Sequence, residues 1–261
     1  MPDTSRPGLR QSLLAAAGIA RSLRIYYGDR ARLRRMRALY ARFIKPGDLV
    51  FDVGAHVGDR TGVFHSLGAR VVAVEPQPAA FRCLQWMHGG KRGVTLLRKA
   101  VAAAEGELQF RINTRNPTVS TASEDFMAAA DGAPGWEGQR WDSVRRVEAV
   151  TLDKLIEVYG TPSFIKIDIE GFEDRALEGL SVPVPALSFE FTTIQRGVAR
   201  RCLNRLGQLG AYRFNAALGE SQVLVLSEFC TGEAIAQWLD ALPATANSGD
   251  IYAVLHSAPC T

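Results

Sequence analysis

LVFDVGAHVGDRTG, residues 49–62, is the stretch that decides the fold. Its first five residues are apolar apart from Asp52 and are typical of a strand buried on both faces of a sheet. Gly54 and Gly58 suit a tight turn in which the backbone passes close to a ligand. Asp59 and Thr61 are good residues for starting a helix. Strand, turn and helix together predict a pocket at the carboxyl end of a strand in an open α/β sheet.

The glycine spacing indicates which kind of ligand enters that pocket. A dinucleotide fingerprint has the form G-x-G-x-x-G, whereas Gly54 and Gly58 are four residues apart, which argues against a dehydrogenase. The buried run 71–74 ends in Glu75-Pro76, about 20 residues further on, and an acid there can accept both hydroxyls of a ribose. The pattern favours a nucleoside cofactor. The alternative is an ordinary α/β protein with a helix-capping loop and a surface Glu75.

The rest of the chain reads as alternating strands and helices, with a hairpin around Gly219 near the end. Strands that alternate with helices in the first part of the chain predict parallel pairs joined by crossovers, and the hairpin near the end predicts an antiparallel pair. Together they favour a mostly parallel sheet with an antiparallel edge. The predicted strands after residue 75 are 94–97, 107–112, 147–150, 164–168, 187–191, 212–215, 222–226 and 251–255. The predicted helices of this main domain, 46–261, are 61–67, 79–87, 151–159, 172–180, 198–209 and 231–242.

Residues 1–45 form a basic arm with eleven Lys or Arg residues and two acids, whereas the remainder has 20 bases and 25 acids. Apolar residues recur at helical spacing from 11 to 43, with a break predicted at Gly28-Asp29. We expect one or two amphipathic helices packed on the main domain. The arm can contact nucleic acid, anionic lipid, an acidic substrate or a second copy of the chain; the alternative is a solvated helix face.

Composition excludes several classes of protein. No apolar run approaches the roughly 18 residues of a membrane span. The four cysteines are scattered, which favours neither a zinc site nor disulfides and predicts a reduced, cytoplasmic setting. Residues 113–146 are irregular but contain Trp136 and Trp141. We interpret them as a lid or substrate wall with a short helix near 124–130, the alternative being a mobile surface insert.

Two strings, DVGAHVG at 52–58 and IKIDIEGFE at 165–173, resemble the FkbM-type methyltransferase family, with support from Val74-Glu75-Pro76. The resemblance covers roughly 46–190, and the family usually has Asn where His56 stands. It implies a Rossmann-like class I methyltransferase fold with a seven-stranded sheet. It also implies methyl transfer from S-adenosylmethionine, leaving S-adenosylhomocysteine, to a hydroxyl of a sugar, glycolipid or macrolide-like product.

The resemblance also implies roles for individual residues. One group would bind the cofactor through the glycine turn, the ribose acid and an adenine wall: Asp52, Gly54, Ala55, His56, Gly58, Glu75, Pro76, Ala100 and Val101. A second group, in the loop where substrate is expected, consists of Asn116, Ser120 and Thr121.

Asp168 follows a buried strand that is expected to open into the same pocket. Crowded acids raise one another's pKa, as a base for a sugar hydroxyl requires. Our hypothesis is that Asp168 is the base or substrate orienter beside the cofactor, aided by Glu170 and Glu190. The alternative is that Asp168 and Glu170 cap the next helix and pair with Lys166. Together with Glu173 these acids are also hard-metal ligand types, so a divalent ion stays open without being predicted.

Two other functions stay open at this point. One is a non-catalytic S-adenosylmethionine-binding or assembly protein that docks through the basic arm. The other is a nucleic-acid methyltransferase, although no RNA-binding module is present and nucleic acid is not a predicted partner.

Overall fold

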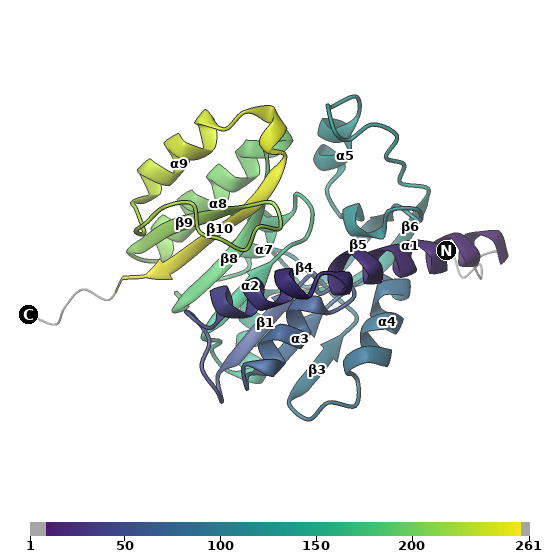
Figure 1. Ribbon diagram of the computed structural model, residues 1–261, viewed down its shortest axis with the longest axis horizontal. Helices are drawn as coiled ribbons and strands as arrows, with labels where there is room; N and C mark the ends of the chain where they lie inside the picture. Colours follow the sequence, from purple (N-terminus) through teal and green to yellow (C-terminus); the bar gives the residue numbers. More distant parts are fainter. Residues whose placement is uncertain (1–8, 257–261) are drawn as a thin grey trace, which may run out of the picture.

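The structure, a computed structural model, describes residues 9–256 and is built on a seven-stranded sheet (Figure 1). Strand β10 runs antiparallel to both of its neighbours, and the other pairings are parallel. This confirms the predicted mostly parallel sheet with an antiparallel edge. In spatial order the strands are β3 (Val94–Leu97), β2 (Arg70–Val74), β1 (Leu49–Val53), β7 (Phe164–Ile167), β8 (Ala186–Thr192), β10 (Ser248–Leu255) and β9 (Tyr212–Leu218).

The chain order reverses beside β1. The chain moves outward from β1 through β2 to β3, then returns to place β7 on the other side of β1. A crevice forms outside the carboxyl ends of the strands at such a switch point, and ligands of open α/β sheets bind there. The topology therefore places the predicted pocket between Gly54 and Asp168.

Every residue of β1 and of β7 is buried, which shows that both faces of the sheet are covered. Phe51 and Ile165 face one apolar cluster, with residues of helices α6 (Leu152–Tyr159), α7 (Glu173–Glu178), α8 (Arg196–Leu209) and α9 (Gly232–Ala241). Val50 and Phe164 face the other, with residues of α2 (Arg30–Tyr40), α3 (Asp59–Ser66) and α4 (Pro78–His88). Each fully buried Phe contributes about 1.5–3 kcal/mol, so this alternation fixes the register of the strands.

Within the described residues the basic arm is helical from 9 to 40, as predicted, and the break falls at Asp29. Helix α1 spans Leu9–Gly28, and the Asp29 carboxylate then caps α2 by accepting hydrogen bonds from the backbone N–H groups of Ala31 and Arg32. Met36 and Tyr40 are completely buried in the main core. Helix α2 is therefore packed into the fold rather than lying loosely on it. None of the described helices combines the length and apolar content needed to cross a bilayer.

A separate three-stranded sheet stands beside the main one, in the order β4 (Ala100–Val101), β6 (Ser143–Val150), β5 (Gly106–Ile112). Between β5 and β6 the predicted irregular segment contains a short 3₁₀ turn at Pro117–Val119 and α5 at Glu124–Ala130, as expected. Phe126 and Trp136 pack edge to face at 5.2 Å between ring centroids, within a small core of their own. The segment thus has its own packing and forms a wall beside the sheet.

The prediction of a hairpin between 212–215 and 222–226 is wrong, because β9 pairs with a different strand. Strand β9 pairs along its length with β10, which arrives after α9, and its backbone pairs with the 222–226 segment at an isolated bridge from Ala217 to Leu224. The side chain of Asn215 holds that segment by bonding both the N–H and the carbonyl of Leu226. The predicted antiparallel edge is present, but residues 222–226 are held by the side chain of Asn215 and do not pair as a strand.

Candidate active site

A cleft opens at the switch point between β1 and β7 and offers about 580 Å³ of space, part of which is open to solvent. Its walls come from the glycine turn, the strand ends, the wall segment after β5 and helix α1. The lining residues are Tyr26, Gly54, Ala55, His56, Asp59, Arg60, Glu75, Pro76, Gln77, Phe110, Pro117, Thr118, Ser120, Asp168, Ile169 and Glu170.

The turn after β1 is tight because two glycines adopt left-handed backbone. Gly54 has φ +81°, and a Cβ added there would lie 1.8 Å from the carbonyl oxygen of Asp168. Gly58 has φ +82°, and its added Cβ would lie 2.5 Å from the Leu84 side chain. Only glycine permits this approach of β1 to β7, so the floor of the cleft depends on Gly54.

Asp52 lies beneath the turn and does not line the cleft. It is 1% exposed, and its Oδ2 accepts a 2.5 Å hydrogen bond from the Thr61 hydroxyl in the first turn of α3. Burial raises its pKa to about 6 although the Thr61 bond opposes the rise. Asp52 therefore fixes α3 against β1 and shapes the turn indirectly.

Glu75 lines the cleft, and each of its carboxylate oxygens accepts one hydrogen bond from a backbone N–H group. Oε2 accepts from the His56 N–H at 2.9 Å, and Oε1 accepts from the Gln77 N–H at 2.7 Å. Burial raises its pKa to about 7, although these two bonds oppose the rise. A carboxylate oxygen can accept more than one hydrogen bond, so Glu75 is held in place and can still accept from a diol.

Two further features fit a bound nucleoside. The Nε2 atom of His56 is buried without a hydrogen-bond partner in the described structure, and burial lowers the pKa of this histidine to about 4. Beside the cleft lies a smaller cavity of about 280 Å³, walled largely by apolar residues that include Ala100, Val101 and Phe110. It shares Gly54 and Pro76 with the main cleft, so the predicted adenine-wall residues Ala100 and Val101 lie next to that cleft.

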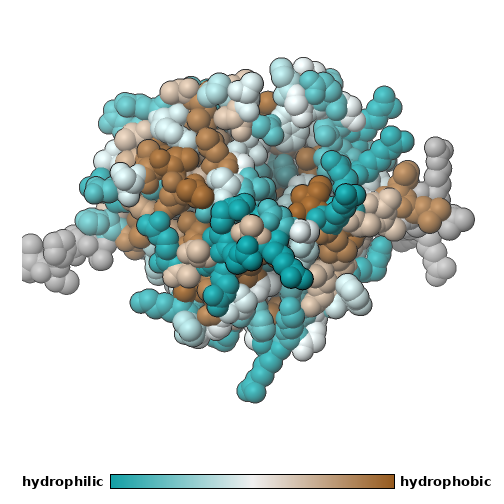
Figure 2. Space-filling view, viewed as in Figure 1, coloured by the Kyte–Doolittle hydropathy of each residue, from teal (hydrophilic) through white to brown (hydrophobic). Residues whose placement is uncertain are grey.

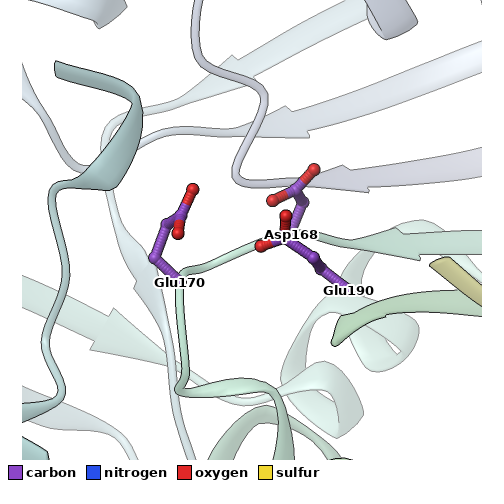
Figure 3. A group of neighbouring side chains, drawn as sticks. All are labelled: Asp168, Glu170 and Glu190. Atoms are coloured by element: carbon purple, nitrogen blue, oxygen red, sulfur yellow. The ribbon is translucent and has the colours of Figure 1, made fainter. Parts of the chain in front are cut away.

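Three carboxylates meet at the other end of the cleft (Figure 3). Asp168 follows β7, Glu170 lies in the next loop with φ +56°, and Glu190 comes from β8. One oxygen of each lies within 4.8 Å of the others. The strand ends and the loop thus bring together three acids, as the sequence predicted.

Crowding affects the three acids differently. Burial, reinforced by the charge of Asp168, raises the pKa of Glu170 and of Glu190 well above the ordinary value. Burial also pushes the pKa of Asp168 upward, but the Lys166 and Arg60 cations and a hydrogen bond from Glu190 lower it to about 2. The expected rise in pKa is therefore wrong for Asp168 and right for its two neighbours.

Two cations account for this difference. Lys166 is fully buried, with its Nζ 2.6 Å from Asp250 and 3.2 Å from Asp168. Arg60 lies 3.6 Å from Asp168 and 3.3 Å from Glu220. Lys166 and Arg60 therefore place positive charge next to Asp168, as a bound divalent ion would.

The alternative structural role, in which Asp168 and Glu170 cap the next helix and pair with Lys166, is observed only in part. Asp168 does pair with Lys166, but it does not cap the following helix. Glu173 instead bonds the backbone N–H groups of Ile169 and Gly171, at 3.0 and 3.3 Å. The carboxylates of Asp168 and Glu170 consequently stay directed to the cleft.

Replacing Lys166 with Met is expected to lower the free energy of unfolding by about 3–5 kcal/mol, because it leaves buried carboxylates without their partner. Urea denaturation measures the change. Lys154→Met is the matched control, since Lys154 forms an exposed pair with Glu157, and it should unfold like the wild type. Equal stability of the two variants would contradict a charge-compensating role for Lys166.

The predicted substrate residues separate in the structure. Ser120 lines the cleft. Thr121 lies behind the cleft wall, where its hydroxyl donates a 2.7 Å hydrogen bond to the Glu170 carbonyl. Asn116 lies outside the cleft lining and bonds Gln139 within the wall segment. Only Ser120 is placed for direct contact with a ligand in this cleft.

Sequence reasoning missed Tyr26 and Arg60. Tyr26 reaches the cleft from α1 and packs edge to face on His56 at 5.9 Å between ring centroids. No local motif marks a residue 28 positions before the glycine turn. Arg60 had a weak signal, because it stands two residues after Gly58 in the first turn of a helix that begins at the cleft.

The sheet order, with the cleft at the switch point beside β1, places the chain in the class of proteins with the Rossmann-like class I methyltransferase fold. Within that class it belongs to the Methyltransferase FkbM domain family, whose profile matches residues 52–198. The family expected from the sequence is thereby confirmed, and S-adenosylmethionine is the cofactor expected of it.

Individual proteins resemble the chain at low identity. The hexuronic acid methyltransferase AglP of Haloferax volcanii is 24% identical over 162 residues, so the match spans 61% of each chain. A Bacillus cereus O-methyltransferase solved with S-adenosylhomocysteine is 12% identical, with a TM-score of 0.46 and coverage of 97% of this chain and 94% of that one. A precorrin-6y C5,15-methyltransferase from Geobacter metallireducens is 13% identical, with a TM-score of 0.44 and coverage of 85% and 87%.

Proposed function

We propose that the protein methylates a hydroxyl group of a glycan, a glycolipid or a macrolide-like product. The observation that carries this proposal is the cluster of Asp168, Glu170 and Glu190, of which Asp168 and Glu170 line the cleft. S-adenosylmethionine, when bound, supplies an electrophilic methyl group. A hydroxyl becomes a competent acceptor when a nearby base removes its proton.

The three acids divide this work according to their charges. Asp168 stays ionised and accepts a hydrogen bond from the acceptor hydroxyl, which orients it. Glu170 lines the cleft, and its raised pKa makes its ionised form, which prevails at pH values above that pKa, the stronger proton acceptor. Glu190 is not part of the cleft lining, and in its protonated form it donates a hydrogen bond to Asp168 and keeps that carboxylate in position.

The charge of the cleft favours a hydroxyl over a carboxylate as the acceptor. Hexuronic acids, which the name of AglP gives as its substrate, offer both groups. A carboxylate acceptor would approach the ionised Asp168 and be repelled, whereas a neutral hydroxyl is attracted as a donor. We therefore propose ether formation for this chain.

Transfer of labelled methyl groups from S-adenosylmethionine to a panel of uronic acids and matched neutral sugars tests the proposal. An ether product keeps its label in alkali, whereas a methyl ester releases it as methanol. Alkali-stable label on a hydroxylated acceptor is the expected result. A product that is entirely alkali-labile would contradict methylation of a hydroxyl.

Glu75→Gln is expected to weaken S-adenosylhomocysteine binding about 10–100-fold, because a charged hydrogen bond contributes about 1.5–3 kcal/mol. Wild-type affinity should also fall as the pH drops through about 7, since Glu75 then gains a proton and loses its charge. Calorimetry across that pH range measures both effects. Glu107→Gln, an exposed change on β5, is the control, and a variant at Glu75 that binds like it would remove Glu75 from the cofactor site.

A further inference from the structure

One face of the molecule gathers arginines around helices α1 and α2. Exposed arginines project from both helices: Arg21, Arg24, Arg30, Arg34 and Arg35. Asp29 is the only acidic residue between positions 9 and 45. Figure 2 shows the resulting hydrophilic patch over α2, at the centre of the view. The face is therefore strongly cationic.

Exposed aliphatic side chains flank these arginines. Leu13 and Ile25 on α1 are 63% and 49% exposed, and Val223 and Val225 in the segment after β9 are 57% and 39% exposed. That segment is attached to α2, because the Arg35 side chain donates a 3.1 Å hydrogen bond to the Ser221 carbonyl. Figure 2 shows hydrophobic areas on both sides of the hydrophilic patch. We call α1, α2 and residues 221–226 together the arginine face.

The arginine face borders the mouth of the cleft on two sides. Ile25 is exposed, whereas the next residue, Tyr26, lines the cleft. On the other side, Glu220 immediately precedes the aliphatic segment and pairs with Arg60 of the cleft at 3.3 Å. A surface in contact with this face would lie next to the entrance of the active site.

We propose that the arginine face docks on a lipid surface that carries anionic headgroups. Arginines pair with lipid phosphates, and aliphatic side chains enter the headgroup layer between them, which is the combination that binds peripheral helices to membranes. Nucleic acid fits less well, because unpaired bases stack on aromatic side chains, whereas the large apolar residues exposed on this face, Leu13, Ile25, Val223 and Val225, are aliphatic. The orientation also brings the cleft to a lipid-linked acceptor, a consequence that rests on the proposed function.

Sedimentation of the full chain with two kinds of vesicle tests this docking. Vesicles of phosphatidylcholine mixed equally with phosphatidylglycerol should carry the protein down at low salt, and phosphatidylcholine vesicles should not. The double variant Arg30→Glu/Arg34→Glu should partition at least about 30-fold more weakly, since each basic residue near such a surface contributes about 1 kcal/mol. Val223→Ser/Val225→Ser should bind more weakly at every salt concentration, because the aliphatic contact is not screened.

Matched variants elsewhere on the protein separate these effects from net charge and apolar content. Arg92→Glu/Arg98→Glu changes the same charge beside β3, the outer strand of the main sheet, and Val158→Ser removes an exposed valine on α6. Both should bind anionic vesicles like the wild type. Absent sedimentation, or equal loss in the Arg92/Arg98 variant, would overturn the proposal. So would arginine-dependent binding to RNA in place of vesicles.

Discussion

Replacing Gly54 with Ala is expected to abolish measurable S-adenosylhomocysteine binding and to lower the free energy of unfolding by about 2–6 kcal/mol. The added methyl group would stand 1.8 Å from the Asp168 carbonyl oxygen, and the backbone has φ +81°. Left-handed strain costs about 1–3 kcal/mol and overpacking about the same again. The two strand ends must separate, and the floor of the cleft is lost with them. Urea denaturation and calorimetry on the refolded variant measure the two effects.

Gly47→Ala is the matched control for this prediction. Gly47 has φ +90°, but nothing lies within 4 Å of its added Cβ. It should show the strain cost alone and bind S-adenosylhomocysteine normally. If Gly54→Ala matched the control in both stability and affinity, the close approach of β1 to β7 would not form the cofactor floor.

Asp168→Asn and Glu170→Gln are each expected to reduce kcat about 10²–10⁴-fold, the usual contribution of a positioned proton acceptor or its partner. Affinity for S-adenosylhomocysteine should change little in Glu170→Gln, because the proposed role of Glu170 concerns the acceptor. A carboxyl with a raised pKa is protonated, and so inactive as a base, at low pH. The wild-type kcat should therefore rise with pH through a midpoint above the ordinary Glu value of about 4.3, and Glu170→Gln should lose that rise.

Steady-state rates across pH, with thermal melts to verify folding, provide the measurement. Glu157→Gln, an exposed change on α6, serves as control and should leave the profile intact. Near-normal turnover of folded Asp168→Asn would exclude Asp168 from orienting the acceptor. An unchanged pH profile in Glu170→Gln would exclude Glu170 as the base.

Local signals in the sequence predicted the elements that build the cleft. The β1 run and its glycine turn are encoded within 49–58, where apolar continuity and glycine spacing act over a few residues. Helix α5 was predictable for the same reason, since Ser123 caps it by accepting a hydrogen bond from the Phe126 N–H. The strand carrying Lys166 and the acid at 168 also followed from their own segment.

Features that depend on distant contacts could not be read from the sequence. The low pKa of Asp168 arises from Lys166 in its own segment, but also from Arg60, 108 residues earlier, and from a hydrogen bond with Glu190 of the next strand in the sheet. Tyr26 enters the cleft only because α1 crosses the wall segment, where an added Cβ on Gly18 would lie 2.8 Å from Pro117. The pairing of β9 with β10 could not be predicted locally, because β10 follows only after α9. Residues 222–226 lie nearer in the sequence, but the side chain of Asn215 holds them and they form no strand.

Calorimetric titration of the natively folded chain with S-adenosylhomocysteine tests the central claim most directly. One nucleoside should bind per chain with measurable heat, and the heat should disappear in Gly54→Ala and weaken in Glu75→Gln. A folded wild-type protein that releases no heat with this nucleoside or with S-adenosylmethionine would contradict a cofactor site above the Gly54 turn.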